Sequence, residues 1–222
     1  MNKVIAIDGV ASSGKGAVTK IVAEKLNLTS IDTGSMYRAI ALETINKNIS
    51  IDEVDKIIDI AKNCTIKLDP SGVVYLNGED VTKYLKTKEV NSIVSQVSSI
   101  PEVREILVEQ QRKMAEDIDV IMEGRDITTV VFPNTKYKFY LDADVEERAK
   151  RRHLQNKELG IDIPYEEVLE SIKFRDENDK NKPVGALKRC DDQIYIDTTN
   201  MSIDEVVNEI ISKVKEIEEE SK

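Results

Sequence analysis

A glycine-rich segment near the start of the chain has the residue types of a phosphate-binding loop. It places a glycine, four further residues, a second glycine and a lysine in succession, as Gly9-Val10-Ala11-Ser12-Ser13-Gly14-Lys15-Gly16. Glycine lets the backbone curl so that several N–H groups point at one anion, and a following helix adds the positive end of its dipole. Lys15 supplies a full positive charge. These residue types at this spacing predict a site for phosphate.

The sequence on either side of this segment supports that interpretation. An apolar run at 4–7 precedes it, and apolar residues recur at helical spacing within 15–26. A strand, a loop and a helix are therefore expected in that order. A glycine-rich turn that only joins a strand to a helix is the alternative.

Two later polar clusters also follow predicted strands, as Asp32-Thr33-Gly34-Ser35-Met36-Tyr37-Arg38 and Glu123-Gly124-Arg125-Asp126. Ligands of open parallel sheets bind at the carboxyl ends of the strands. Arg38 lies one helical turn past Gly34, from where it can reach back toward a phosphate. Three strand ends would then bring a phosphate loop, a cation and an Arg–Asp pair into one crevice, which favours a site for two phosphorylated groups.

Short apolar runs alternate with helical patterns along the chain, which predicts an α/β fold with a central parallel five-stranded sheet flanked by helices. The strands are expected at 3–8, 29–32, 120–123, 137–141 and 193–197. Ser50 with Glu53, and Ser202 with Glu205, have the spacing of a capping box, which predicts a helix start at each.

Residues 64–86 interrupt this rhythm and predict a small antiparallel β insertion. Strands are expected at 65–68 and 73–76 around the turn Asp69-Pro70-Ser71-Gly72, with a third near Val81. The insertion is either a mobile flap over a substrate or an addition that only stabilises the fold, and the sequence leaves both open.

Composition limits the function classes. The chain has 222 residues, 40% of them hydrophobic, which suits one compact α/β domain with a sizeable insertion or two small domains. No apolar stretch approaches the ~20 residues that span a bilayer, and the apolar run at the N-terminus is too short for a signal peptide. Cys64 and Cys190 follow no metal-binding pattern and are expected to be reduced thiols of a cytoplasmic protein.

The formal net charge of −10 opposes binding to a polyanion, so nucleic acid is not expected as a partner, and without a bilayer-spanning stretch neither is a membrane. A small phosphorylated substrate can still bind where folding gathers arginines. The densely charged segment 173–182 is either a solvated helix face or part of a lid whose cations close over a triphosphate.

Taken in order, these motifs resemble those of the bacterial cytidylate kinases, within the nucleoside monophosphate kinase family of P-loop proteins. The resemblance runs nearly end to end. It rests on Gly14-Lys15-Gly16, on Asp32-Thr33-Gly34 with Tyr37-Arg38, on Ser95-Gln96-Val97 with Pro101 and Arg104, on Gly124-Arg125-Asp126 with Thr129-Val130-Val131-Phe132-Pro133, on Glu147-Arg148-Ala149 with Arg151-Arg152, and on Arg175-Asp176 with Asp179.

The resemblance implies an ATP-dependent kinase of pyrimidine nucleotide metabolism that acts on CMP or dCMP, with Mg²⁺ as the cofactor of ATP and a monomer as the default state. It also implies a single domain over 1–222. The core would comprise 1–34, 87–150 and 190–222, a monophosphate-binding region with the β insertion would span 35–100, and a helical lid would span 151–189.

Site residues follow from the same resemblance. The ATP site would comprise Gly9, Val10, Ala11, Ser12, Ser13, Gly14, Lys15, Gly16, Ala17, Arg151 and Arg152. The CMP site would comprise Asp32, Thr33, Tyr37, Arg38, Ser95, Arg104, Arg125, Asp126, Arg175 and Asp179. Lys15, Arg125 and Arg175 would be catalytic, and Glu123 is the candidate to hold Mg²⁺ through water.

Within the CMP site, the resemblance implies three tasks. Arg38 and Arg125 would grip the acceptor phosphate. Arg175 and Asp179, on the lid, would meet the acceptor sugar or the phosphates in flight. The edge of cytosine would be read by Ser95, Arg104 and Asp126.

Four places depart from the family's usual pattern. Ala17 stands where a hydroxyl residue is expected, and Thr128 where a glycine commonly follows the Arg–Asp pair. Lys182 replaces a second lid arginine, which keeps the charge but loses the bidentate fork. The residues Pro183-Val184-Gly185 also differ from the family's usual sequence.

Two other functions compete with this interpretation. One is a kinase for another small acceptor, such as UMP or shikimate, although a shikimate site would need cations for a carboxylate. The other is a nucleotide-dependent switch, which would not need the second set of phosphate-directed arginines. A switch would hydrolyse ATP slowly and independently of CMP, whereas the kinase would release ADP only when CMP is present.

Overall fold

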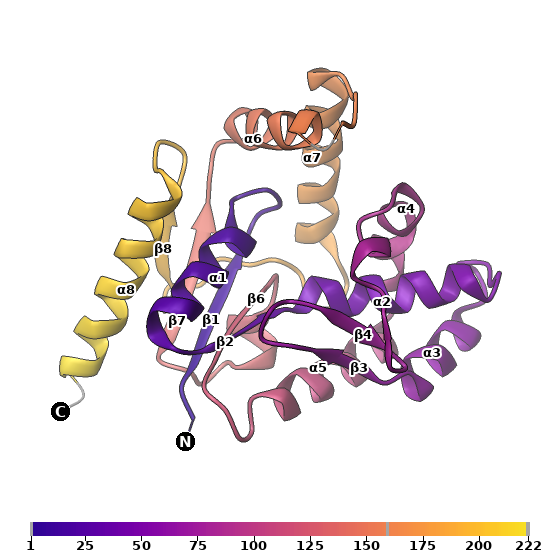
Figure 1. The fold of residues 1–222 in the computed structure, drawn as a ribbon, viewed down its shortest axis with the longest axis horizontal. Helices are drawn as coiled ribbons and strands as arrows, with labels where there is room; N and C mark the ends of the chain where they lie inside the picture. The colour runs from indigo at the N-terminus through magenta and orange to yellow at the C-terminus, as the bar shows by residue number, and fades with distance from the viewer. Residues whose placement is uncertain (1, 159, 221–222) are drawn as a thin grey trace.

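The computed structural model describes residues 2–158 and 160–220. Its centre is a parallel five-stranded sheet in the order β2-β6-β1-β7-β8 (Figure 1). The strands are β1 (Val4–Gly9), β2 (Thr29–Asp32), β6 (Val120–Gly124), β7 (Tyr137–Asp142) and β8 (Ile194–Asp197). All five predicted strands are confirmed, with ends that differ by at most one residue.

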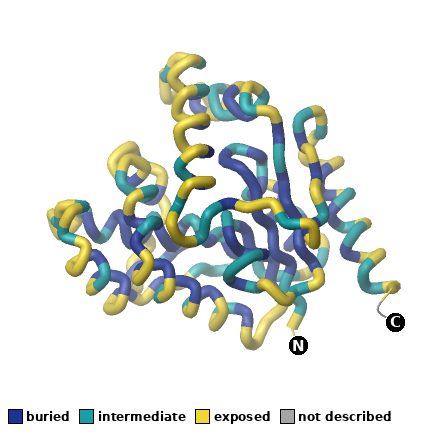
Figure 2. The backbone as a smooth tube through the Cα atoms, turned by 180° about the vertical axis from the view of Figure 1, so that it is seen from behind, coloured by how far each residue is buried: buried dark blue, intermediate teal, exposed yellow. Residues whose placement is uncertain are grey.

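The sheet is apolar on both faces because helices cover both. Ile5 and Ile7 of β1 pack with α1 (Lys15–Leu26) and α8 (Ile203–Glu220) on one face. Ala6, between them, faces the other side and packs with α5 (Pro101–Met114). Burial on both faces explains why the strand sequences are continuous apolar runs and do not alternate. Figure 2 shows these strands as the buried centre of the molecule.

A second apolar core lies beside the sheet. It is built from α2 (Thr33–Asn46), α3 (Val54–Asn63), α4 (Lys88–Val97), α5 and a small antiparallel sheet. That sheet contains β3 (Ile66–Leu68), β4 (Val74–Leu76) and β5 (Glu79–Asp80), and a 3₁₀ turn at Thr82–Tyr84 follows it. The predicted hairpin is therefore confirmed, and its third strand ends one residue before Val81. Ile66, Val74 and Leu76 are buried in this core, so the insertion contributes to stability.

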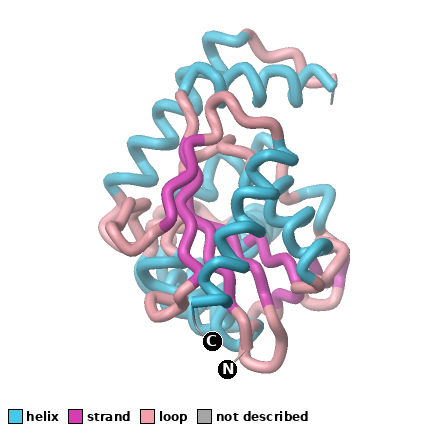
Figure 3. The backbone as a smooth tube through the Cα atoms, turned by 90° about the vertical axis from the view of Figure 1, so that its left-hand side faces the viewer, coloured by secondary structure: helices cyan, strands magenta, loops and turns pink. Residues whose placement is uncertain are grey.

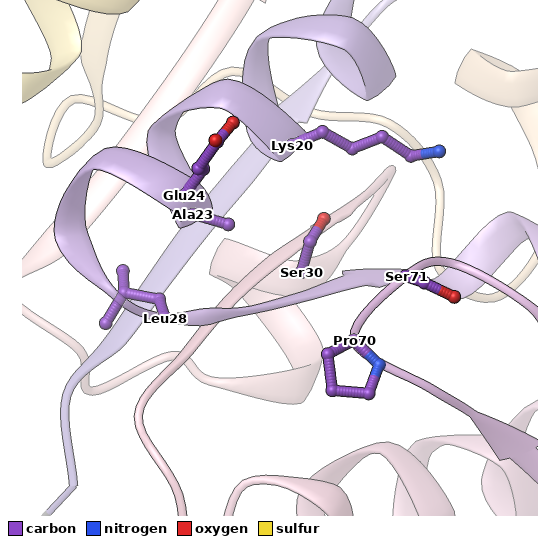
Figure 4. Close-up of a pocket in the computed structure, with 7 residues that line it drawn as sticks. All are labelled: Lys20, Ala23, Glu24, Leu28, Ser30, Pro70 and Ser71. Carbon is purple, nitrogen blue, oxygen red and sulfur yellow. The ribbon is translucent and has the colours of Figure 1, made fainter.

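The tip of the β3–β4 hairpin lies beside α1. Figure 4 shows Pro70 and Ser71 across a cleft of about 350 Å³ from Lys20 and Glu24 of that helix. The insertion thus reaches from the second core to the helix that follows the glycine-rich loop.

Two helices project beyond the carboxyl ends of the strands (Figure 3). They are α6 (Val145–Glu158) and α7 (Tyr165–Asn181), and we call them the α6–α7 hairpin. Ala149, Val168 and Ile172 hold the two helices together. Residues 182–193, called the return segment below, lead from α7 to β8. None of the helices within residues 2–158 and 160–220 is long and apolar enough to cross a membrane.

One of the two predicted capping boxes is wrong. At the start of α8, Glu205 accepts the Ser202 N–H at 2.8 Å and donates its own N–H to the Ser202 hydroxyl at 3.3 Å, as expected. At the start of α3, Glu53 accepts the Ser50 N–H at 3.0 Å, but the Ser50 hydroxyl accepts from Asp52 and not from Glu53. A turn precedes α3, so its first residue is Val54 and Ser50 lies too far upstream to cap it.

Asp8 joins the end of β1 to the turn after β6. Its fully buried carboxylate accepts the N–H groups of Ile127 and Thr128, both at 2.8 Å, and the Thr128 hydroxyl at 2.5 Å. Burial raises the pKa of Asp8 from 3.8 to about 6, although these hydrogen bonds favour the charged form. The residues bonded here belong to a short π-helical turn, Ile127–Val131, which directly follows Arg125 and Asp126.

We expect Asp8→Asn to destabilise the protein by about 1–3 kcal/mol, because the amide keeps one acceptor oxygen and turns an N–H₂ group toward donors. The free energy of unfolding in urea measures this change. Asp52→Asn, an exposed position near α3, is the control and should unfold like the parent. Equal stability of Asp8→Asn and Asp52→Asn would contradict the expectation.

Candidate active site

The glycine-rich segment forms a tight loop between β1 and α1. Gly9 has a φ of 153°, and a Cβ there would lie 2.0 Å from the carbonyl oxygen of Leu141, so only glycine fits. The ammonium of Lys15 is buried and donates to the carbonyls of Gly9 at 2.8 Å and Val10 at 2.6 Å, and to the Ser13 hydroxyl at 3.2 Å. The Lys15 ammonium therefore lies against the backbone of the glycine-rich loop at the start of α1.

Lys15 lies among other ionisable groups. Burial, reinforced by the nearby Arg125, lowers the pKa of Lys15 from 10.5 to about 7. Burial and the neighbouring Asp32 raise the pKa of Glu123 above its usual range. Asp32 and Glu123 are register partners on β2 and β6, which puts two carboxylates beside the loop.

Arginines from three parts of the chain form one group, in which Arg125 and Arg175 lie near Lys15. Arg38 of α2 places its Nη1 close to Gly34, as the helical spacing predicts. Arg125 follows β6, and Arg152 and Arg175 come from α6 and α7. Burial, reinforced by the positive charges of Arg125 and Arg38, lowers the pKa of Arg175 to about 10. Burial and Arg38 likewise lower the pKa of Arg152. Mutual repulsion of this kind is expected where a site is built for several negative charges.

Asp179 of α7 counters part of this positive charge. Its carboxylate pairs with Arg125 Nε at 2.7 Å and with Lys182 Nζ at 3.1 Å. Burial alone would raise the pKa of Asp179, but Arg125 and Lys182 hold it well below its usual range. Lys182 also donates to the Ser98 hydroxyl at 2.9 Å, so the return segment touches the end of α4.

A buried polar cluster lies next to these arginines. Arg104 pairs with Asp126 at 2.5 Å, donates to the carbonyl of Ser98 at 2.9 Å, and lies over the Tyr37 ring at 5.1 Å. The Arg104 Nε has no hydrogen-bond partner within the described residues, and the Tyr37 hydroxyl lies beside Gln111. Ser95 is half-buried, and its carbonyl accepts from the Ser98 hydroxyl at 3.0 Å. Arg104 and Asp126 are thus in direct contact, whereas Ser95 is linked to Arg104 only through Ser98.

Sequence reasoning gave α6 two functional arginines and missed a third. Arg148 is buried and donates to the carbonyls of Ala143 at 2.9 Å and Ala11 at 3.0 Å, and pairs with Asp176 of α7 at 2.7 Å. It therefore links the glycine-rich loop to α7. Its position in the run Glu147-Arg148-Ala149 was the available signal, but the sequence does not show which arginine of α6 faces inward.

The two predicted arginines of α6 lie in different surroundings. Arg151 donates to the carbonyls of Thr198 at 2.6 Å and Thr199 at 3.0 Å. The Thr198 hydroxyl in turn donates to the Ser13 carbonyl at 3.3 Å, so Arg151 lies on the side of the glycine-rich loop. Arg152 instead lies near Arg38, on the side of α2.

Two departures from the family pattern have structural consequences. Thr128 uses its extra hydroxyl as the bridge between Asp8 and the side-chain amide of Gln193, which donates to it at 2.5 Å. Ala17 lies exposed in the first turn of α1, and neither it nor Gly16 offers a hydroxyl to a phosphate or a metal ion.

Comparison with solved structures supports the fold. A protein from Eubacterium ventriosum matches with a TM-score of 0.55 at 16% identity, covering 96% of this chain and 99% of its own. A gluconokinase from Sinorhizobium meliloti matches with a TM-score of 0.51 at 12% identity, covering 99% and 94%. At such low identity these similarities concern the fold alone.

Sequence comparison is more specific. The family model for cytidylate kinase matches residues 5–216. A cytidylate kinase of Caldanaerobacter subterraneus subsp. tengcongensis is 46% identical over 211 residues, covering 95% of this chain and 94% of the relative. That of Fusobacterium nucleatum is 45% identical over 217 residues, covering 97% and 99%. With its phosphate loop, converging arginines and buried Arg104–Asp126 pair, this chain belongs to the cytidylate kinase family of phosphate-transferring enzymes.

Proposed function

We propose that this protein transfers the γ-phosphoryl group of ATP to CMP or dCMP, giving ADP and CDP or dCDP. The observation that carries the proposal is the convergence of Lys15 with four arginines between the glycine-rich loop and the buried Arg104–Asp126 pair. The loop would hold one nucleotide and the buried polar cluster the base of another, and the cations between them are of the kind that a phosphate in transfer requires.

Positioning and charge neutralisation account for most of the catalysis in phosphoryl transfer. The N–H groups of residues 9–17 and the Lys15 ammonium would hold the ATP phosphates. Arg38 and Arg125 would hold the acceptor phosphate, and Arg175 would stabilise the charge that spreads over the transferring group. Guanidinium groups suit this task, because their planar forks match phosphate oxygens and they stay charged at neutral pH.

Base selection would depend on Asp126 and Arg104. The exocyclic amine of cytosine donates hydrogen bonds, so it needs an acceptor such as the Asp126 carboxylate. Uracil has a carbonyl at that position, which would leave two acceptors facing each other. The free Arg104 Nε is a donor for an acceptor atom of the base.

Residues 151–189, which include most of the α6–α7 hairpin and the start of the return segment, would act as a lid. Asp179 reaches Arg125, and Asp176 reaches Arg148, which itself binds the Ala11 carbonyl. The positions of the lid, the acceptor arginine and the ATP loop are therefore linked by direct ion pairs and hydrogen bonds. This arrangement favours an active lid over a merely solvated face for the charged segment 173–182.

The donor groups beside the loop fit Mg²⁺. This ion prefers oxygen ligands, and it usually keeps several waters and binds one or two carboxylates together with substrate phosphates. Asp32 and Glu123 are the carboxylates in place, and within the described residues no set of three acidic, histidine or cysteine side chains forms a protein-only site. When bound with ATP, Mg²⁺ supplies charge neutralisation at the phosphates.

A coupled assay of ADP release over CMP, dCMP, UMP, AMP and GMP tests the proposed function. We expect ADP release to require an acceptor and to be fastest with CMP or dCMP, because cytosine presents a donor to Asp126 where uracil presents a carbonyl, and the purine bases are larger. Slow ATP hydrolysis that is indifferent to CMP would contradict the kinase and favour the switch. Fastest turnover with another acceptor would contradict the assignment of the base.

The role of Asp126 can be tested with Asp126→Asn, which keeps the side-chain size but adds a donor. The ratio of kcat/KM for CMP to that for UMP should fall by about tenfold or more. Asp192→Asn, which removes the acidic partner of Lys138, is the matched control and should keep the parent ratio. Unchanged selectivity in folded Asp126→Asn would show that another group reads the base.

The lowered pKa of Lys15 predicts a pH dependence of ATP binding. Above about pH 7 the free protein increasingly holds neutral Lys15, and a bound triphosphate should restore the ammonium. ATP affinity should therefore fall as the pH rises from 7 to 9, with proton uptake on binding. Calorimetry in two buffers of different ionisation enthalpy measures that uptake. The arginine of Lys15→Arg stays charged, so this variant should bind ATP without taking up a proton. Equal proton uptake by the parent and by Lys15→Arg would contradict the prediction.

A further inference from the structure

An apolar cluster joins the return segment to the glycine-rich loop. The side chain of Leu187 lies in this buried cluster with Val10 and Tyr140, and the exposed fractions of the three residues are 4%, 3% and 5%. Val10 is the second residue of the glycine-rich loop, and Tyr140 lies in the middle of β7. The segment that follows α7 therefore supplies part of the packing that surrounds the loop.

Val10 also contributes to the surroundings of Lys15. Its carbonyl accepts the Lys15 ammonium at 2.6 Å and the Ser13 hydroxyl at 3.1 Å. The carbonyl of the next residue, Ala11, accepts from Arg148 of α6 at 3.0 Å. Two successive residues of the loop are thus held from the side of the α6–α7 hairpin and the return segment, one by an apolar cluster and one by a hydrogen bond.

The return segment is itself anchored at several points. Lys182, at its start, pairs with Asp179 of α7 at 3.1 Å. Gly185 lies against the guanidinium group of Arg104, where a Cβ at residue 185 would lie 2.1 Å from Nη2. Leu187 donates its N–H to the Asp179 carbonyl at 2.8 Å. The backbone of Leu187 is therefore fixed to α7, while its side chain packs with the loop.

The members of the apolar cluster differ in how freely they can move. Tyr140 is fixed by backbone pairing on both sides, because β7 lies between β1 and β8. Val10 lies in a loop outside the sheet. If the Leu187 side chain were removed, the cavity would be filled mainly by movement of Val10, because the surroundings of a cavity relax where they are least constrained. That movement would displace the carbonyl that accepts the ammonium.

We propose that Leu187 is a positioning residue for the glycine-rich loop. It holds Val10, and through the Val10 carbonyl the ammonium of Lys15, in the arrangement that binds the phosphates of ATP. The affinity for ATP would then depend on the return segment being in place. This inference rests on the proposed function, because the loop is assigned there to ATP, and it is independent of the residues proposed to read the acceptor base.

Leu187→Ala tests the inference, and Leu85→Ala is its matched control. Leu85 is also a buried leucine, 2% exposed, but it lies in the second core. Both variants should lower the melting temperature, because each loses buried apolar contacts. Calorimetry of ATP binding with Mg²⁺, without an acceptor, separates them. We expect Leu187→Ala to raise the Kd for ATP by about tenfold or more, and Leu85→Ala to change it by less than about twofold.

Further variants distinguish the positioning of Val10 from general damage. Leu187→Met keeps most of the apolar volume and should bring the Kd to within about threefold of the parent value. In a Val10→Ala background, adding Leu187→Ala should raise the Kd by less than about twofold further, because the side chain that Leu187 holds is already missing. Should Leu187→Ala fail to fold, Leu187→Val replaces it and should raise the Kd by about threefold or more.

The inference is overturned if folded Leu187→Ala, or Leu187→Val in its place, binds ATP like the parent. It is also overturned if Leu85→Ala loses as much affinity, if Leu187→Met does not recover it, or if the loss is equal in the Val10→Ala background. CMP-dependent release of ADP by the parent tests the proposed function separately. A parent that shows this release, together with a Leu187→Ala variant that binds ATP normally, would contradict this inference alone.

Discussion

The hydrogen bonds of the buried Asp8 carboxylate hold the site together. Asp8 ends the apolar part of β1 one residue before the phosphate loop, and it binds the turn that carries Arg125 and Asp126. A buried carboxylate without hydrogen-bond partners would cost several kcal/mol. The turn is therefore held in the position where its N–H groups donate to Asp8. Gln193 binds Thr128 and accepts the Cys190 N–H, which extends this network to the return segment.

The charge of the site opposes the charge of the molecule. The chain carries −10 overall, yet Lys15 and four arginines meet at the carboxyl edge of the sheet. Asp179 pairs with Arg125, while burial, together with the positive charges of Arg125 and Arg38, lowers the pKa of Arg175. The acidic surface disfavours large polyanions, whereas the local excess of positive charge suits small phosphorylated molecules.

The α6–α7 hairpin and the return segment that follows it contact the rest of the site in three places. Asp176 meets Arg148 beside the phosphate loop, Asp179 meets Arg125 beside the turn after β6, and the return segment lies on Arg104. A shift of α7 would alter all three at once. The proposed binding of ATP, binding of the acceptor phosphate and selection of the base would therefore depend on one arrangement, and a substitution in any one contact is expected to affect the others.

The sequence by itself determined the elements and the kind of chemistry. The strands, the helix at 15–26, the hairpin at 66–76 and the cap at Ser202 depend on residues close together in the chain, because hydrogen bonding and burial within one element have a fixed period. The phosphate loop and the Arg–Asp pair were likewise visible as local motifs. Only the tertiary structure decided that Arg148 faces inward while Arg151 binds the turn before α8, that Thr128 bridges Asp8 and Gln193, and that Gly185 rests on Arg104. These contacts join residues from separate elements, up to 137 positions apart for Arg148 and Ala11, and no local period predicts which side chains meet when such elements pack.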